Sequence, residues 1–303
     1  MDQPFRLPGF KELELGDREV ITDFLRRFPP EISELTFTNL FMWNHKNRFS
    51  WRVAAEVLYL MAAPIEGTLP YLFPPKGPKL DFREVKRLFQ AMAQAGHPGR
   101  MERVPAAVAK ALAPELPELV ITPDRDNFDY VYSREALATL AGRRYSRKRN
   151  HIKRFTGSHD WAYLPFTPEL VQQCLELQEY WCNLKHCEED PGLRLEHRSI
   201  AIALRHADRL SFAGACIAVA GKIQAFSLGE SLNPDTAVIH VEKANPELEG
   251  LYPTLTHEYV KNAWPDVAWI NREQDLGEPG LRQAKESFFP DHLIEKYRVE
   301  LPA

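Results

Sequence analysis

The chain has 303 residues, of which 44% are hydrophobic and 26% are charged, and its formal net charge at pH 7 is −4. These values are ordinary for a globular protein with a sizeable core, and the length suits one large domain or two of about 150 residues each. The acidic balance argues against a protein that is basic all over and binds nucleic acid, although it leaves a local basic patch open.

Two features of the sequence bear on where the protein works. The four cysteines, Cys174, Cys182, Cys187 and Cys216, are too few to cross-link a chain of this length, and the polar start Met1–Pro4 shows no sign of a secretory leader. Together they favour a reducing, cytoplasmic compartment. No apolar run reaches the roughly 18 residues of a membrane-spanning helix, so we expect no membrane span and contact with lipid only at the membrane surface.

The first half of the chain alternates strand and helix patterns. They predict a strand over 10–15, helices over 17–28 and 36–43, strands over 49–53, 57–61 and 69–73, and a helix over 81–95. Prolines concentrate in residues 62–79 and 105–123, which we interpret as loop-rich stretches. We place the boundary between the halves near residues 124–127, and assign residues 1–126 to a first domain and 127–303 to a second.

A strongly basic stretch follows this boundary. Residues 134–154 contain eight arginines and lysines and one glutamate, a local charge of +7. Because charge of one sign concentrates anionic partners, we interpret the stretch as a helix that contacts phosphates of tRNA, a nucleotide or an anionic lipid headgroup. The residues assigned to this contact are Arg147, Arg149 and Lys153. The alternative is a solvated helix face without a partner.

The second half shows a clearer pattern. It predicts a strand over 160–166, helices over 170–184 and 196–207, strands over 212–219, 223–231 and 237–242, a helix over 252–263, a strand over 267–271, a helix over 280–288 and a strand over 293–299. This is the order of the GNAT fold, an antiparallel meander followed by a strand–helix–strand crossover. We interpret the first half as a fainter copy, and predict an α+β protein of two tandem GNAT-like domains with mixed, mostly antiparallel sheets flanked by helices. The alternative is a single mixed α+β domain.

The cysteines also raise the question of a metal site. Cys182 and His186 lie four residues apart on a predicted helix, with Cys187 beside them and His197 further on. This spacing is not that of a zinc ribbon or finger, so we expect core packing and a polar helix end, and no metal.

The strand that ends the second meander carries polar residues. His240 and Glu242 share one face and Lys243 points to the other, because side chains alternate along a strand. In GNAT folds this strand parts from the next one and lines the substrate cleft, where a carboxylate can bind or deprotonate an amine. We therefore assign Glu242 and His240 as catalytic candidates and Lys243 to substrate binding. The alternative is an ordinary Glu–Lys pair on a sheet.

The loop over residues 245–250 precedes the helix whose amino end holds the pyrophosphate of coenzyme A in GNAT relatives. In those relatives the loop is rich in glycine and basic, whereas here it contains Glu247, Glu249 and one glycine. Two carboxylates repel a pyrophosphate, so the loop argues against acetyl-coenzyme A. Tyr252, at the start of the helix, is assigned to substrate binding.

Charged residues of both signs and two glycines follow the next predicted strand. Loops on a rigid scaffold can position such polar groups, so we interpret the cluster as a site. Asp275 is assigned as a further catalytic candidate, and Asn271, Arg272, Arg282 and Lys285 are assigned to substrate binding. The alternative is a group of salt bridges that fastens the loop to the helix after it.

Several of these stretches are shared with a known family. Residues 37–43, 145–150, 221–230, 240–245 and 271–290 carry the resemblance, and the last two are the most specific. On them the chain resembles, over nearly its full length, a bacterial family related to the C-terminal catalytic domain of phosphatidylglycerol lysyltransferase. That family is similar to tandem GNAT folds, including Fem-type transferases that use aminoacyl-tRNA. The lysyltransferases also carry a large membrane-embedded half that this sequence does not contain, which weakens the case for lipid as the acceptor.

The resemblance implies an acyltransferase or aminoacyltransferase that moves its group to an amine or a hydroxyl. We expect aminoacyl-tRNA or acyl-coenzyme A as the donor, a small molecule, peptide or lipid headgroup as the acceptor, and no tightly bound cofactor. Glu242 or Asp275 would bind or deprotonate the acceptor, and Arg282 and Lys285 would hold an anionic part of a substrate. Two alternatives stay open: a non-catalytic GNAT-like module that binds tRNA or an anionic metabolite, and a coenzyme A-dependent N-acetyltransferase.

Overall fold

A computed structural model describes residues 5–65 and 68–302, so the polar start Met1–Pro4 lies outside the described residues. The chain folds as two compact units. Unit 1 comprises Met1–Asp129, Gln274–Arg282 and Leu293–Ala303, and unit 2 comprises Tyr130–Glu273 and Gln283–His292. Among the described helices, none combines the length and the apolar character that crossing a membrane requires.

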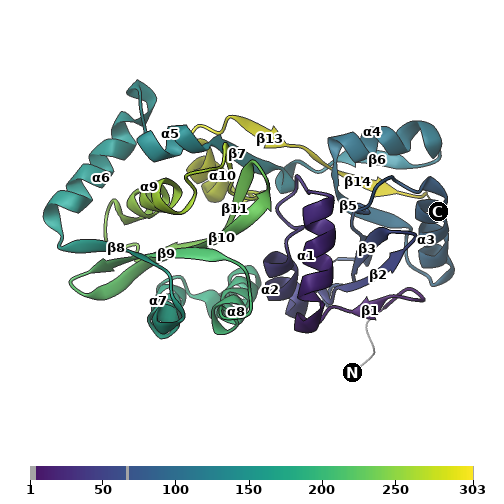
Figure 1. Ribbon diagram of the computed structural model, residues 1–303, viewed down its shortest axis with the longest axis horizontal. Helices are drawn as coiled ribbons and strands as arrows, with labels where there is room; N and C mark the ends of the chain where they lie inside the picture. The colour runs from purple at the N-terminus through teal and green to yellow at the C-terminus, as the bar shows by residue number, and fades with distance from the viewer. Residues whose placement is uncertain (1–4, 66–67, 303) are drawn as a thin grey trace. The chain divides into compact units, whose positions relative to one another are not determined.

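Unit 1 is built on one sheet, whose described strands lie in the order β1, β2, β3, β4, β5, β14 and β6 (Figure 1). Neighbouring strands are antiparallel except β4 and β5, which pair in parallel. The strands are β1 (Lys11–Glu12), β2 (Ser50–Ala54), β3 (Val57–Ala62), β4 (Tyr71–Leu72), β5 (Arg100–Pro105), β6 (Val120–Pro123) and β14 (Lys296–Glu300), and the helices are α1 (Arg18–Arg27), α2 (Phe37–Asn47), α3 (Phe82–Gln94) and α4 (Ala106–Glu115).

The core of unit 1 forms between the sheet and helices such as α3. Asp81 begins α3, because its carboxylate accepts a hydrogen bond from the backbone N–H of Glu84 (3.1 Å). Val85, Leu88 and Met92 then recur at helical spacing and are buried against the sheet. The predicted helix over 81–95 is thereby confirmed.

The stretch 105–123, interpreted from its prolines as loop-rich, contains a helix and a strand. Pro105 precedes the first residue of α4, Pro114 lies in its last turn, and Pro123 ends β6. Pro105 and Pro123 lie at element boundaries, where a missing N–H and a fixed φ do little harm, whereas Pro114 removes one backbone hydrogen bond from the last turn of α4. The prolines therefore mark the ends of regular elements instead of preventing them.

The last predicted strand, over 293–299, divides into two strands. β13 (His292–Ile294) joins the sheet of unit 2, whereas β14 pairs with β5 and β6 in the sheet of unit 1. The assignment of residues 127–303 to one domain is corrected accordingly for β14. Val299 of β14 is fully buried in the core of unit 1, and that long-range packing cannot be read from a local pattern.

Unit 2 is built on a second sheet, whose described strands lie in the order β13, β7, β12, β11, β10, β9 and β8. Figure 1 shows α7 and α8 on one face of the sheet and α9 with α6 on the other. The remaining strands are β7 (Asp129–Ser133), β8 (Trp161–Pro165), β9 (Ala213–Val219), β10 (Lys222–Asn233), β11 (Thr236–Ala244) and β12 (Trp269–Asn271), and the helices are α5 (Arg134–Thr139), α6 (Ser146–Ser158), α7 (Val171–Leu184), α8 (Pro191–Arg205), α9 (Leu251–Ala263) and α10 (Pro279–Glu286), the last with residues in both units.

The basic stretch over 134–154 is not one helix. It forms α5 and α6, separated by residues 140–145, where Leu140 and Gly142 have positive φ angles of 49° and 87°. The helix predicted over 196–207 also differs, since α8 begins at Pro191. There the carboxylate of Asp190 accepts hydrogen bonds from the backbone N–H groups of Gly192 (2.8 Å) and Leu193 (3.1 Å).

The feature that positions the site is the end of the parallel pairing between β11 and β12. The two strands pair at Thr236 with Trp269 and at Val238 with Asn271, and β11 then continues to Ala244 paired with β10 on its other side. The adjacent strand β10 has an irregular register at this level, and a Cβ on its Gly229 would lie 2.4 Å from the carbonyl oxygen of Val238. Beyond Val238, the backbone of β11 pairs with no described strand on the side of β12, and this is where His240 and Glu242 lie.

Candidate functional site

Glu242 and Arg272 form an ion pair where β11 and β12 part. The Nε of Arg272 donates to Oε2 of Glu242 over 3.0 Å, its Nη2 donates to the same oxygen, and the hydroxyl of Thr256 on α9 donates to Oε1 over 2.6 Å. Their side chains are only 13% and 12% exposed. Burial opposes the charge on the guanidinium, but the carboxylate outweighs it and raises the pKa of Arg272. The guanidinium of Arg272 therefore stays charged at neutral pH in a poorly solvated place.

His240, two residues before Glu242, lies between two carboxylates. Its Nδ1 is 2.7 Å from Oε1 of Glu273 and its Nε2 is 3.0 Å from Oε1 of Glu230, and its side chain is 1% exposed. Burial alone would lower the pKa of His240, but the hydrogen bonds and charges of the two glutamates raise it to about 9. The imidazole is therefore protonated at neutral pH, and a protonated imidazole does not act as a base.

Asn271 and Lys285 hold the end of β12 in place. The side-chain oxygen of Asn271 accepts a hydrogen bond from the backbone N–H of Glu273 (2.8 Å), and the ammonium of Lys285 donates to the carbonyl of Arg272. The hydroxyl of Tyr132 on β7 in turn donates to the carbonyl of Lys285 (2.9 Å). Both predicted substrate-binding residues are buried, so in this structure they shape the turn that carries Arg272 and Glu273.

Lys148, on α6, is a cation of this site that the sequence analysis did not single out. Its Nζ donates to Oγ of Ser287 (2.7 Å) and lies 3.8 Å from the ring centre of Phe288. Burial, followed by the charges of Arg272 and Arg147, lowers the pKa of Lys148 to about 8. Helical spacing in the sequence could have indicated that Lys148 faces inward. Positions 148, 152 and 155 share one face of α6, Tyr145 precedes that face by one turn, and Tyr145 and Phe155 are buried.

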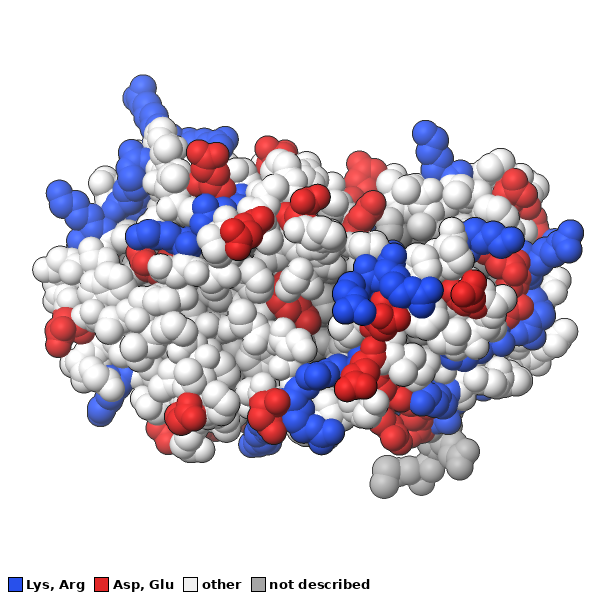
Figure 2. All heavy atoms as spheres, in the orientation of Figure 1, with Lys and Arg blue, Asp and Glu red and all other residues white. Residues whose placement is uncertain are grey.

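The three residues predicted to contact phosphates differ in their surroundings. Arg147 and Lys153 are exposed on α6, and Figure 2 shows lysines and arginines gathered over this helix. Arg149 is already engaged, because its Nη1 donates to the carbonyls of Leu140 and Gly142 (2.8 Å for Gly142) after α5. The structure therefore gives Arg149 a role in holding the turn between α5 and α6.

Lys243 and Tyr252 lie near the carboxyl end of β11, where Lys243 faces α7 and α8. The Nζ of Lys243 is 2.8 Å from Oε2 of Glu196 and 3.6 Å from the ring centre of Trp181, whose indole N–H donates to the hydroxyl of Tyr252 (3.0 Å). Burial lowers the pKa of Lys243, and Glu196 opposes that effect. The sequence prediction that Lys243 and Glu242 point to opposite faces is confirmed.

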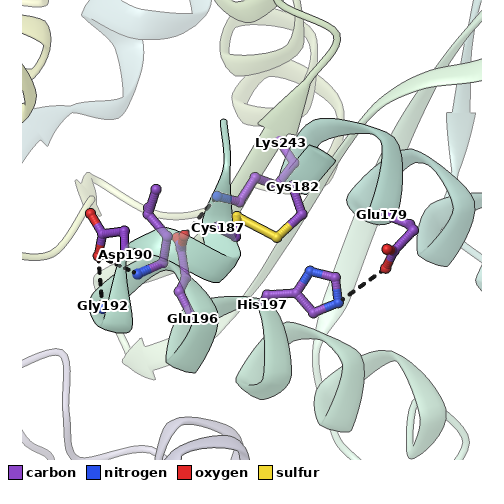
Figure 3. Close-up of a disulfide and its surroundings, with 9 residues drawn as sticks. Glu179, Cys182, Cys187, Asp190, Gly192, Glu196, His197 and Lys243 are labelled. Carbon is purple, nitrogen blue, oxygen red and sulfur yellow. Dashed lines mark hydrogen bonds and ion pairs between the residues drawn. A yellow bond between two sulfur atoms is a disulfide. The ribbon is translucent and has the colours of Figure 1, made fainter. Parts of the chain in front are cut away.

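Beside Lys243, Cys182 and Cys187 are joined as a disulfide with a Cα–Cα distance of 5.1 Å (Figure 3). The bond closes the short connection between α7 and α8, and the sequence analysis did not predict this pair. Cys182, considered with His186 as a metal-ligand pair, is bound to Cys187 instead. Cys174 and Cys216 are buried and are not disulfide-bonded.

The structure also bears on metal binding. Within residues 5–65 and 68–302, no group of three His, Cys, Asp or Glu side chains is placed to hold a metal ion.

Asp275 and Arg282 belong to unit 1. Asp275 is fully buried, and its Oδ2 accepts from Nε of Arg282 (2.7 Å) and Nη1 of Arg125 (3.1 Å). Its Oδ1 accepts from the backbone N–H of Gly277 (2.9 Å), whose φ is 78°. This arrangement fastens the loop to the helix after it, which was the alternative given for this cluster. Asp275 and Glu242 belong to different units, and the catalytic role assigned to Asp275 stays a prediction.

Comparison with known proteins identifies a family and a fold. Residues 25–300 match the family described as "Phosphatidylglycerol lysyltransferase, C-terminal". A solved structure of a conserved protein of unknown function from Bacteroides thetaiotaomicron VPI-5482 is 33% identical, covers 98% of this chain and 100% of that one, and has a TM-score of 0.92.

Two more distant structures share the fold. The C-terminal domain of a putative lysylphosphatidylglycerol synthetase from Agrobacterium fabrum is 14% identical, with 95% of this chain and 92% of that one covered and a TM-score of 0.67. A tandem GNAT protein from the clavulanic acid biosynthesis pathway is 10% identical, with 97% and 98% covered and a TM-score of 0.51. The predicted tandem GNAT-like fold and the family resemblance are confirmed.

A curated relative covers a shorter part of the chain. The uncharacterised protein MYCGA3080 of Mycoplasmoides gallisepticum is 23% identical over 177 residues, which are 57% of this chain and 56% of that protein. The chain thus spans little more than half of this relative's length.

Proposed function

The chain belongs to the family of phosphatidylglycerol lysyltransferase C-terminal domains, and we propose that its unit 2 transfers an aminoacyl or acyl group from an activated ester to an amine or hydroxyl acceptor. The observation that carries this proposal is the ion pair of Glu242 and Arg272 at the point where β11 and β12 part. It places a carboxylate and a guanidinium side by side with little water around them. Acyl transfer needs one group to manage the acceptor's proton and another to stabilise negative charge.

The proposed reaction proceeds through a tetrahedral intermediate. The acceptor nitrogen or oxygen forms a bond to the carbonyl carbon, and Glu242 takes up the acceptor's proton. Arg272 stabilises the oxyanion, which then collapses as the bond between the carbonyl carbon and the donor oxygen breaks. The leaving oxygen receives the proton. The protonated His240 keeps Glu230 and Glu273 fixed beside this pair, so its proposed role is positioning.

The loop before α9 favours an aminoacyl ester of tRNA over a coenzyme A thioester as the donor. Glu249 in this loop pairs with Nη1 of Arg154 (3.0 Å) and Nδ1 of His151 (3.2 Å). A Cβ on Gly250 would lie 2.4 Å from the carbonyl oxygen of His151, so the backbone of α6 packs directly against the loop. Carboxylates and a close helix occupy the place where a helix amino end would receive a pyrophosphate.

The test is single-turnover loss of the ester from labelled aminoacyl-tRNAs, run beside a panel of acyl-coenzyme A thioesters, with amine, peptide and phosphatidylglycerol acceptors. We expect ester loss that depends on an acceptor, and a decrease of about 100-fold in Glu242→Gln. The glutamine preserves an acceptor for Thr256 and Arg272, and Glu247→Gln, an exposed carboxylate nearby, is the matched control. Full turnover in Glu242→Gln would refute the assignment.

A second candidate function is supported by the basic surface of α6 (Figure 2). The same unit could bind tRNA without acting on it. Binding that weakens steeply with salt, because several phosphates are contacted, together with no loss of ester under any acceptor, would favour this candidate.

A further inference from the structure

The disulfide of unit 2 joins the two elements that enclose Lys243. Cys182 lies in the last turn of α7 and Cys187 lies shortly before α8. Figure 3 shows the bond beside Lys243 and Glu196. Trp181, the residue before Cys182, has its ring centre 3.6 Å from Nζ of Lys243, and Glu196 on α8 has Oε2 2.8 Å from the same nitrogen. The partners of Lys243 thus come from both sides of the bond.

Lys243 depends on these partners because it is buried. Its side chain is 5% exposed, and burial lowers the pKa of the ammonium while Glu196 opposes that effect. A buried ammonium that loses its partners carries an uncompensated charge, which is strongly unfavourable. If Trp181 and Glu196 move apart, we therefore expect Lys243 to turn toward water and to displace the end of β11, where Glu242 is its neighbour in the chain.

Trp181 is also connected to Glu242 through α9. Its indole N–H donates to the hydroxyl of Tyr252 in the first turn of that helix (3.0 Å). One turn later, the hydroxyl of Thr256 lies 3.2 Å from the carbonyl oxygen of Tyr252 and donates to Oε1 of Glu242 (2.6 Å). The contacts of the disulfide thus continue, through one tryptophan, to the carboxylate that the proposed reaction uses.

The position of the bond suits a local role better than stabilisation of the whole fold. Stabilisation by a disulfide grows with the number of residues that it encloses, and these cysteines are only five positions apart. The two cysteines are 8% and 2% exposed, but residues 183–186 and 188–190 around them are exposed. Local opening of so short a surface segment admits a small thiol. Accessible disulfides are the ones that exchange readily with thiols.

We propose that Cys182 and Cys187 form a thiol–disulfide exchange site that regulates transfer at Glu242. The inference rests on the proposed function, since it concerns regulation of the same site. In the disulfide state, Trp181 and Glu196 are held around Lys243. Reduction lets α7 and α8 separate at this end, so Lys243 becomes exposed, Glu242 loses its fixed position and transfer slows.

The exchange takes a dithiol as its reductant. A thiolate of the dithiol bonds to one protein sulfur while the bond between Cys182 and Cys187 breaks, and the other protein sulfur leaves as a thiolate and takes up a proton. The second thiol of the reagent then attacks the mixed disulfide and releases the remaining cysteine as a thiol. The protein gains two electrons and two protons, and the dithiol is oxidised to its own disulfide.

The first experiment measures the enclosure of Lys243 without turnover. The full chain, before and after reduction with dithiothreitol, is treated with an amine-reactive acetylating ester, and labelling of each lysine is followed by mass spectrometry. Lys243 should react roughly fivefold faster after reduction and slowly again after reoxidation, because labelling requires an opened side chain. Lys222, an exposed lysine on the adjacent strand β10, is the control and should keep its rate.

The second experiment compares single-turnover ester transfer in the two forms. Reduction should lower the rate at saturating donor roughly tenfold and leave half-saturation nearly unchanged, because a displaced Glu242 affects the chemical step. Cys182→Ser with Cys187→Ser should be slow with or without the dithiol. Cys174→Ala with Cys216→Ala, which removes two buried thiols of the same unit, is the matched control and should keep both the rate and the response to reduction.

The outcomes separate this inference from the proposed function. Equal labelling of Lys243 in the two forms overturns it, as does a parent protein in which all four cysteines titrate as thiols before reduction. Equal rates in the two forms of a protein that transfers through Glu242 overturn it as well. Labelling of Lys243 that follows the disulfide, in a protein that transfers no ester, would support the enclosure and remove the transferase.

Discussion

Each unit contains a group of buried charges, and the two groups differ in how fully their hydrogen-bond donors are used. In unit 1, the ammonium of Lys296 is fully buried and directs its donors to Oε1 (2.8 Å) and Oε2 (2.7 Å) of Glu34 and to Oδ1 of Asp129 (2.6 Å). An ammonium has three hydrogens, so Lys296 is satisfied. In unit 2, Arg272 leaves Nη1 without a partner among the described residues, and Lys148 donates to the hydroxyl of Ser287 and lies against the ring of Phe288.

This difference separates a structural role from a binding role. A buried cation whose donors are all matched has nothing to offer a ligand, and its removal damages the fold. A cation that keeps an unmet donor is costly by itself and becomes favourable when a ligand supplies oxygen. Four predictions test the contrast, beginning with the largest expected effect.

Removing the satisfied cation should destabilise the protein strongly. Lys296→Met would leave Glu34 and Asp129 facing each other in the core of unit 1, and breaking such a buried group costs about 3–5 kcal/mol. Urea unfolding followed by circular dichroism measures the change. Lys110→Met, an exposed lysine on α4, is the control and should leave the free energy of unfolding nearly unchanged. A loss below about 1 kcal/mol in Lys296→Met would contradict the structural role.

The protonated His240 should make stability depend on pH. Its folded pKa of about 9 exceeds the unfolded value of about 6.5. The stabilisation is therefore complete below pH 6.5 and is lost as pH rises through 9, a change of about 3 kcal/mol. Urea unfolding between pH 6 and 10 (about one measurement per pH unit) would show it. His240→Gln removes the titrating group, and equal pH profiles for variant and parent would refute the raised pKa.

Opening the disulfide should have a moderate effect. Cys182 and Cys187 are five positions apart, and closing so short a loop contributes about 2 kcal/mol in the chain-entropy model. Cys182→Ser with Cys187→Ser should lower the melting temperature by a corresponding few degrees. Thiol titration of the unfolded parent should find the two thiols of Cys174 and Cys216 before reduction and four after it. Four thiols before reduction would show that the bond does not form.

The smallest effect concerns the basic residues of α6. Arg149→Met should cost about 1 kcal/mol or less, because its guanidinium is partly solvated while it holds the carbonyls after α5. Lys153→Met should have no measurable effect on stability. Thermal melts of the two variants measure these effects. A larger decrease in melting temperature for Lys153→Met than for Arg149→Met would reverse the two assignments.

Local patterns in the sequence determined much of the fold. The strands of the second meander are mostly apolar runs divided by short turns, α3 and α7 repeat apolar residues at helical spacing, and these elements occur where they were predicted. The predicted boundary near residues 124–127 precedes β7, but a single boundary does not describe the units, because residues 274–282 and 293–303 belong to unit 1. The order of the predicted elements gave the tandem arrangement, with a single mixed domain as the alternative, and the resemblance to a family supported it.

The candidate site was predictable only in part. Glu242, His240 and Arg272 could be named because they are polar residues at the ends of two strands. The sequence could not show whether each charged side chain has a hydrogen-bond partner, because these partners come from distant elements. Arg272 finds Glu242 thirty residues away, and Lys148 finds Ser287 across 139 residues.

The sequence by itself determined the periodic elements, the basic character of residues 134–154 and the polar strand ends, since these depend on neighbouring residues. Only the tertiary structure decided that β14 returns to the sheet of unit 1, that Lys296 is satisfied, and that Lys148 turns inward to Phe288 while Arg147 and Lys153 stay exposed. The physical reason is that pairing, burial and charge compensation depend on which distant residues meet. Lys296 is matched by carboxylates in the core of unit 1, whereas Lys148 in unit 2 meets a hydroxyl and an aromatic ring.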